Sequence, residues 1–165
     1  MRTHRIHVAV VGASDADATT SRHAEAVGEA LARRGAVLVC GGLGGVMEAA
    51  CRGAKAAGGT TIGILPGTDR DAANPFVDVV VPTGMGEARN ALVVRCADAL
   101  VAVGGEFGTL SEIALALRDG KPVVGLDTWE LRRHGRAVDA IVVATSPSDA
   151  VEITLELASA MRHEA

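Results

Sequence analysis

A length of 165 residues is typical of one domain, and a hydrophobic content of 48% is too high for a disordered chain. We therefore expect a single domain over residues 1–165. The net charge of −4, with no tyrosine, one tryptophan and two phenylalanines, argues against a nucleic-acid partner, because such binding uses basic surfaces and stacking aromatics.

Apolar runs and amphipathic helical patterns alternate along the chain. The first half is expected to form strand 6–11, helix 21–34, strand 37–40, helix 46–57 and strand 60–65. The second half is expected to form a polar loop at 68–75, strand 76–81, helix 87–97, strand 99–103, helix 109–118, strands 122–126 and 141–143, and helix 147–161. Several strands are continuously apolar, as in a parallel sheet covered on both faces. The pattern predicts an α/β fold: a three-layer, Rossmann-like, doubly wound and mainly parallel sheet of about seven strands.

The cysteines and the N-terminal segment suggest a cytoplasmic protein. Cys40, Cys51 and Cys96 are far apart and odd in number, which favours buried, inert thiols in a reducing compartment. The apolar run 6–11 is too short for a signal peptide or a membrane span, so no membrane partner is expected. His4 and His7 have no cysteine or acidic residue nearby, so we expect no metal site.

Glycine clusters follow the predicted strands, and the carboxyl ends of parallel strands meet at one edge of a sheet. Glycines allow sharp turns and close approach of a ligand, and helix N-termini offer free N–H groups, so these turns predict a phosphate site. The candidate ligand-binding glycines are Gly12, Gly42, Gly44, Gly45, Gly104, Gly105 and Gly108. The alternative is that they only make tight turns. Neither loop completes a GxGxxG or Walker A motif.

Three residues near these loops carry candidate chemistry. Thr109 and Glu112 fit a capping box, in which Thr109 caps the helix and Glu112 folds back onto it. The alternative is that Thr109 holds a phosphate and Glu112 acts on the ligand as an acid or base. Arg89 either binds a phosphate or pairs at the surface with Glu87, and Met85, just before its helix, is a further ligand-binding candidate.

Four further features have two readings each. The acids Asp15 and Asp17 are interpreted as solvated loop residues, with a role in the nearby site as the alternative, and Asp127 either binds a sugar hydroxyl or caps a turn. Phe107 either stacks on a base or, the preferred interpretation, fills the core under its loop. The run 131–136 is interpreted as a solvated turn, with contact to a phosphate or a partner subunit as the alternative.

The order and spacing of these motifs resemble the LOG-like family of Rossmann-type proteins, often labelled lysine decarboxylase-like. That family has an arginine-bearing helix start, an alanine–aspartate strand entry and a PGGxGTxxE loop. The corresponding stretches here are 84–90, 97–99 and 104–112, with an earlier glycine loop at 41–47. Asn90 and Val103 replace the lysine and proline that are usual in the hydrolases of the family. The amino-acid sequence of these motifs is more similar to the branch that includes DprA-related proteins and molybdenum-cofactor carriers.

The resemblance implies a nucleotide-binding domain and leaves two functions open. In one, Arg89 and Glu112 are catalytic residues that hydrolyse the N-glycosidic bond of a nucleoside 5′-monophosphate, while Thr109 and the amides of 104–108 hold its phosphate. In the other, the chain is a non-catalytic carrier or sensor of a phosphorylated cofactor such as the molybdenum cofactor. In either case the partner is a small molecule, a nucleotide or a phosphorylated cofactor. The resemblance also implies that the chain forms a homodimer or homotetramer. We expect no resident cofactor.

Overall fold

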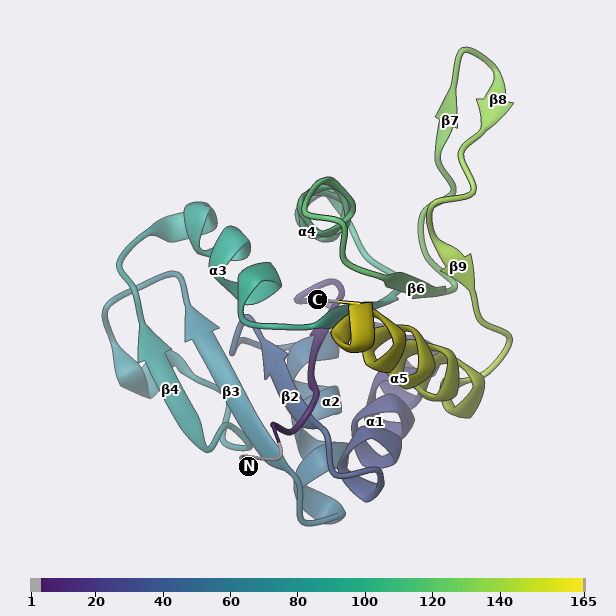
Figure 1. Cartoon of the computed structure of the whole chain (residues 1–165). Helices are drawn as coiled ribbons and strands as arrows, with labels where there is room; N and C mark the ends of the chain where they lie inside the picture. Colours follow the sequence, from purple (N-terminus) through teal and green to yellow (C-terminus); the bar gives the residue numbers. More distant parts are fainter. Residues whose placement is uncertain (1–3, 165) are drawn as a thin grey trace.

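The computed structural model describes residues 4–164, and its centre is a seven-stranded, fully parallel sheet with helices on both faces (Figure 1). The strands follow the sheet order β4-β3-β2-β1-β5-β6-β9. Their bounds are β1 His7–Val11, β2 Val37–Cys40, β3 Thr60–Leu65, β4 Val79–Pro82, β5 Ala99–Val103, β6 Val123–Leu126 and β9 Val142–Val143. This arrangement confirms the predicted three-layer, doubly wound Rossmann-like fold.

The four central strands β1, β2, β5 and β6 are continuously apolar because each buries both of its faces. On β1, Val8 and Val10 pack into the core under helices α1 (Ala18–Arg33), α2 (Val46–Ala56) and α5 (Pro147–Glu164). Ala9 and Val11 point the other way, into the core under α3 (Asn90–Arg95) and α4 (Phe107–Arg118). Alternate residues of one strand therefore supply both helix layers.

Several element bounds differ from the sequence-based expectation. The helix expected at 87–97 is a 3-10 turn, η2 (Gly86–Arg89), followed by the short α3, and the loop at 68–75 contains the 3-10 turn η1 (Arg70–Ala72). The strand expected at 76–81 begins only at Val79, and just before it the carboxylate of Asp78 accepts the Thr61 N–H at 3.0 Å. The solvated turn expected at 131–136 is a hairpin of β7 (Arg132–Arg133) and β8 (Arg136–Ala137).

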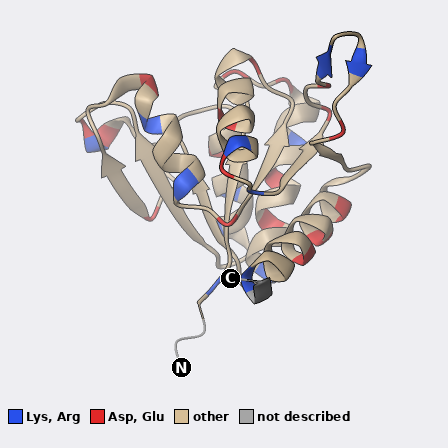
Figure 2. Ribbon diagram, turned by 45° about the horizontal axis from the view of Figure 1, so that its top comes forward, with Lys and Arg blue, Asp and Glu red and all other residues tan. Residues whose placement is uncertain are grey.

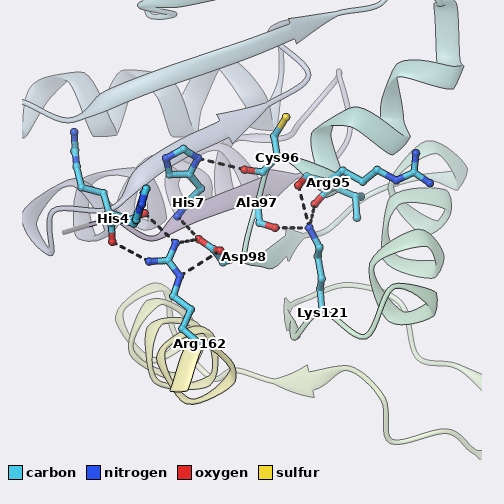
Figure 3. A network of polar contacts seen from close by, with 10 residues as sticks. His4, His7, Arg95, Cys96, Ala97, Asp98, Lys121 and Arg162 are labelled. Carbon is cyan, nitrogen blue, oxygen red and sulfur yellow. Dashed lines mark hydrogen bonds and ion pairs between the residues drawn. The ribbon is translucent and has the colours of Figure 1, made fainter. Parts of the chain in front are cut away.

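The amino-terminal edge of the sheet is closed by a polar clip (Figure 3). The Asp98 carboxylate accepts the His7 N–H at 2.8 Å and an Arg162 Nη2–H at 2.6 Å, while Arg162 Nη1 donates to the His4 carbonyl at 2.8 Å. Beside it, Lys121 Nζ donates to carbonyls at the end of α3, including that of Ala97 at 2.5 Å. A cavity of about 750 Å³ opens here, and the cationic Arg162 and Lys121 that line it are engaged by these bonds.

The opposite edge, at the carboxyl ends of the strands, contains the point where the sheet order reverses. The chain winds outward from β1 through β2, β3 and β4, and then returns to the other side of β1 with β5. Loops that follow β1 and β5 therefore separate in opposite directions and leave space between them. Among residues 4–164, no helix has the length and apolar character needed to cross a membrane.

Candidate functional site

A cavity of about 480 Å³ lies at the carboxyl edge, between the loops that follow β1, β2, β3 and β5. Of the catalytic and ligand-binding candidates chosen from the sequence, five line it: Gly12, Arg89, Gly108, Thr109 and Glu112. The chain brings them together from three separate segments. The cavity therefore coincides with the switch point of the sheet, where ligands of such folds bind.

Gly12 ends β1 at a place where no side chain fits. A Cβ there would lie 2.5 Å from the Val103 carbonyl oxygen and 2.6 Å from Cγ2 of Val46. Its absence lets β5 and the first residue of α2 approach the end of β1. The Val46 N–H then donates to the Ala13 carbonyl at 3.0 Å, which fixes the N-terminus of α2 at the cavity edge.

The N-terminus of α4 forms another wall of the site. The helix begins at Phe107, with Glu106 as the N-cap residue and without a hydrogen bond from its side chain to the cap. Thr109 is therefore inside the first turn and is 3% exposed, so the capping box predicted for Thr109 and Glu112 is wrong. The free N–H groups of the first turn and the helix dipole favour an anion at this position.

Arg89 is a buried cation, only 9% exposed, and not the surface arginine that pairs with Glu87. Its Nη1 donates to Oδ1 of Asn90, and its Nη2 lies 3.5 Å from the Gly41 carbonyl oxygen. Its buried Nε has no hydrogen-bond partner within the part of the chain that the structure describes. Burial lowers the pKa of the guanidinium, and the charge of Glu112 opposes this effect. A buried donor without a partner costs free energy unless a ligand accepts its hydrogen.

A chain of side-chain bonds links Arg89 to the glycine loop before α4. Asn90 accepts from Arg89 and donates through Nδ2 to Ser111 Oγ at 3.2 Å. Ser111 in turn donates to the Gly108 carbonyl at 2.6 Å. The two halves of the site, α3 and α4, are thus held in a fixed relation by Asn90 and Ser111.

Glu112 lies one turn further along α4 and is 7% exposed. Burial raises the pKa of its carboxyl group to about 7, against the opposing effect of the positive charge of Arg89. Near neutral pH, the carboxyl group of Glu112 therefore populates both its protonated and its ionised form. A carboxyl group in that state can give up or accept a proton without a large cost.

The other glycines chosen from the sequence flank the cavity and do not line it. Gly45 caps α2 with φ +63°, and the Gly104 carbonyl accepts from Thr128 Oγ1 at 2.5 Å. Met85 is 48% exposed and also lies outside the lining. The candidates that flank the site are Gly42, Gly44, Gly45, Met85, Gly104 and Gly105.

Besides Ala13, Leu43 and Pro66, polar and flexible side chains that the sequence did not single out as ligand contacts also line the cavity. They are Ser14, Asp15, Met47, Glu87, Asn90 and Glu106. Ser14, Asp15 and Glu106 could have been chosen from the sequence, because each closely follows the end of a strand. Met47 carries no such signal, because its side chain reaches the cavity only through the first turn of α2.

Three remaining candidates have local roles. Asp17 caps α1 by accepting the Thr20 N–H at 2.7 Å, and Asp127 lies at φ +52° with Oδ2 3.3 Å from Nδ1 of His23. Phe107 is 76% exposed, so the interpretation as a core residue is wrong. Its ring lies 5.6 Å from that of Trp129, at the outer start of α4.

These features define a Rossmann-like α/β protein with a cavity at its topological switch point, lined by the buried Arg89 and the N-terminus of α4. The chain belongs to the SLOG cluster4 family, whose model matches residues 5–157. This finding confirms the LOG-like resemblance seen in the sequence.

The relatives found by sequence comparison include a protein without an assigned function and an enzyme. A protein of Archaeoglobus fulgidus with no assigned function is 50% identical over 121 residues, which cover 73% of this chain and 80% of the relative. The cytokinin riboside 5′-monophosphate phosphoribohydrolase of Mycobacterium tuberculosis is 36% identical over 113 residues, 62% of this chain and 60% of its own length. The chain therefore aligns with less than two thirds of that enzyme.

Among solved structures, the molybdenum cofactor binding protein of Rippkaea orientalis superposes with a TM-score of 0.84 at 34% identity, over 94% of this chain and 98% of that one. The molybdenum cofactor carrier protein of Chlamydomonas reinhardtii gives 0.80 at 33%, over 94% and 99%. DNA processing protein A of Streptococcus pneumoniae, at 21% identity and a TM-score of 0.69, shares the fold alone.

Proposed function

We propose that this chain binds a phosphorylated cofactor of the molybdenum-cofactor type and carries it without chemical change. The observation that supports this proposal is the buried Arg89, with an unpartnered Nε, between the N-termini of α2 and α4. A phosphate would accept a hydrogen bond from Nε and also meet the N–H groups of the first turn of α4.

Two features favour a carrier over a hydrolase. The molybdenum-cofactor proteins match nearly the whole of this chain and of themselves, whereas the phosphoribohydrolase matches over 62% of this chain. In addition, Asn90, which accepts a hydrogen bond from Arg89, stands where the hydrolases of the family usually carry lysine. The proposed carrier acts in the cytoplasm, in keeping with three free cysteines.

Thermal denaturation with molybdopterin-type cofactor, AMP or orthophosphate tests the proposal. A ligand at about 100-fold excess over its Kd adds roughly 2.7 kcal/mol, which raises Tm by about 5–10 °C for a chain of this size. We expect that shift with the cofactor, its loss in Arg89→Met, and its retention in Arg118→Met, an exposed arginine on α4. Equal shifts in all three proteins, or none in the native protein, would contradict the proposal.

The second candidate, hydrolysis of a nucleoside 5′-monophosphate, is favoured by one observation. Glu112, with its pKa of about 7, lines the cavity close enough to Arg89 to feel its charge, and could protonate a leaving base or activate water. Incubation with AMP and N6-modified AMPs, followed by detection of free base, decides between the two functions. Base released by the native protein and not by Glu112→Gln would establish hydrolysis, whereas cofactor binding by both proteins without release supports the carrier.

A further inference from the structure

The cavity at the carboxyl edge of the sheet carries more acidic than basic side chains. Among the described residues that line it, Arg89 is the single arginine or lysine, and its buried Nε has no hydrogen-bond partner. The acids in the lining are Asp15, Glu87, Glu106 and Glu112. An excess of carboxylates repels a ligand with several phosphate groups. Beyond one anionic group at Arg89, the rest of the ligand therefore has to suit these carboxylates.

The four acids lie at two distances from the cation. Glu87 and Glu112 are close enough to Arg89 for their charges to raise the pKa of its guanidinium group. Asp15 and Glu106 have no such effect, which places them further from Arg89. Both are exposed, and they follow β1 and β5, two strands that pair in parallel. The cavity thus has a cationic, buried end and an acidic, exposed rim, and we call Asp15 and Glu106 the acidic rim.

The rim carboxylates are not engaged in ion pairs. Within residues 4–164, neither Asp15 nor Glu106 has a lysine, arginine or histidine partner. Glu106 is the N-cap residue of α4, yet its side chain makes no cap hydrogen bond. Figure 2, in which the top of Figure 1 comes forward, shows acidic residues (red) in the loops at this edge of the sheet. An ionised carboxylate only accepts hydrogen bonds, so the rim is suited to a ligand with N–H donors.

An apolar surface lies beside the cation. A Cβ placed on Gly41 would lie 2.6 Å from Nη2 of Arg89 and 2.8 Å from Sδ of Met47, so these two side chains are neighbours. The apolar side chains in the lining are Leu43, Met47 and Pro66. Pockets for small molecules combine such a surface with a few polar groups that fix orientation, and the volume of 480 Å³ is typical of them. The lining therefore suits a flat ring joined to one phosphate.

We propose that the acidic rim selects a heterocycle with two adjacent N–H donors, the 2-amino-4-oxo-pyrimidine edge that guanine shares with pterins. This inference rests on the proposed function, because a phosphate held at Arg89 brings the ring to the rim. The two oxygens of one carboxylate accept both N–H groups of such an edge in parallel. Adenine has an acceptor nitrogen in place of one donor, and its lone pair would face the carboxylate oxygens. The rim therefore favours guanine-type and pterin-type rings over adenine.

Three nucleoside 5′-monophosphates test the rim, because GMP, IMP and AMP share phosphate and ribose and differ at the ring edge. GMP presents two adjacent donors, IMP presents one, and AMP presents one donor beside an acceptor. A hydrogen bond to a charged group changes affinity by about tenfold or more. In isothermal titration calorimetry, we expect the native protein to bind GMP at least about tenfold more tightly than AMP, with IMP between them.

Removal of the rim charges gives the decisive variant. Asp15→Asn with Glu106→Gln keeps the size of both side chains and removes two negative charges. GMP should bind more weakly, whereas AMP should bind equally or more tightly because its phosphate meets less repulsion. The ratio of the two affinities should fall to within about twofold. Glu152→Gln with Glu156→Gln removes the same charge from exposed positions on α5, outside the cavity, and should keep the native ratio.

Separate readouts distinguish this inference from the proposed function. The Arg89-dependent shift in Tm with molybdopterin-type cofactor tests the proposed function, and the ratio of GMP to AMP affinity tests the rim. All four altered side chains are exposed, so the melting temperatures without ligand should match that of the native protein. The inference is overturned if the native protein binds GMP no more tightly than AMP, or if the rim variant keeps the native ratio, even where the cofactor shift is present.

Discussion

At the scale of single residues, the site is governed by two charged side chains removed from water. Arg89 and Glu112 are both buried, and each shifts the titration of the other through its charge. Because burial penalises the charged form of each, the ligand-free site stores unfavourable free energy. A bound phosphate would release part of it.

The first consequence is a stability profile that depends on Glu112. Its carboxyl group has an ordinary pKa of 4.5 when unfolded and about 7 in the native chain. Between these values the native state binds more protons, so the free energy of unfolding falls as pH rises through the window. The full shift corresponds to roughly 3 kcal/mol. Urea unfolding at a series of pH values should show this fall in the native protein and a flatter profile in Glu112→Gln.

The second consequence concerns Arg89. In Arg89→Met the unpartnered Nε and the desolvated charge are both removed, while the volume stays similar. We expect the ligand-free variant to be more stable by about 1–3 kcal/mol, the usual cost of an unsatisfied buried group. Calorimetric melting without ligand measures this difference. A lower Tm than that of the native protein would show that the bonds to Asn90 and Gly41 outweigh the burial cost.

At the scale of elements, the start of α4 depends on the backbone of its loop. Gly105 has φ +113°, and a Cβ there would lie 2.5 Å from Cβ of Thr109. Gly108, three residues on, is already helical, and no atom would lie within 4 Å of a Cβ placed on it. Two neighbouring glycines thus have different reasons to be present.

This contrast gives a matched pair of variants. Gly105→Ala should lower the free energy of unfolding by about 1–3 kcal/mol, because of positive φ and the clash with Thr109. Gly108→Ala should leave stability equal or higher by about 1 kcal/mol, since alanine favours a helix more than glycine does. Because Gly108 lines the cavity, its methyl group should still weaken ligand binding. Chemical denaturation and ligand titration of both variants separate the two effects.

At the scale of the whole molecule, the cysteines on the two sides of the sheet differ in their exposure to solvent. Cys40 and Cys51 are buried together under α2, with their Sγ atoms 3.5 Å apart, whereas Cys96 is exposed at the end of α3. The prediction of three buried thiols was therefore wrong for Cys96. A thiol reagent such as Ellman's should modify Cys96 in the native protein and Cys40 and Cys51 only after unfolding. Rapid reaction of all three would contradict the packing described for α2.

The sheet was predictable because its strands are apolar throughout, as Val8 to Val11 illustrate. The start of α4 was not, because Thr109 and Glu112 have the spacing of a capping box, while the backbone turn at Gly105 places the helix start two residues earlier, at Phe107. The bonds from Arg89 to Asn90 and from Asn90 to Ser111 could not be predicted either. Those bonds depend on how α3 and α4 pack, which local pattern does not encode.

The clip at the amino-terminal edge constrains the order in which the chain can fold (Figure 3). The contact from Arg162 to the His4 carbonyl joins residues 158 apart, and that from Asp98 to His7 joins residues 91 apart. During synthesis, the contacts of β1 with β5 can form only after β5 has been made. The contacts of the residues at the start of β1 with α5 can form only after the last turns of α5 have been made. Such long-range closure slows folding. Within this domain, the central strand β1 therefore precedes in sequence both the strand and the helix that complete its contacts.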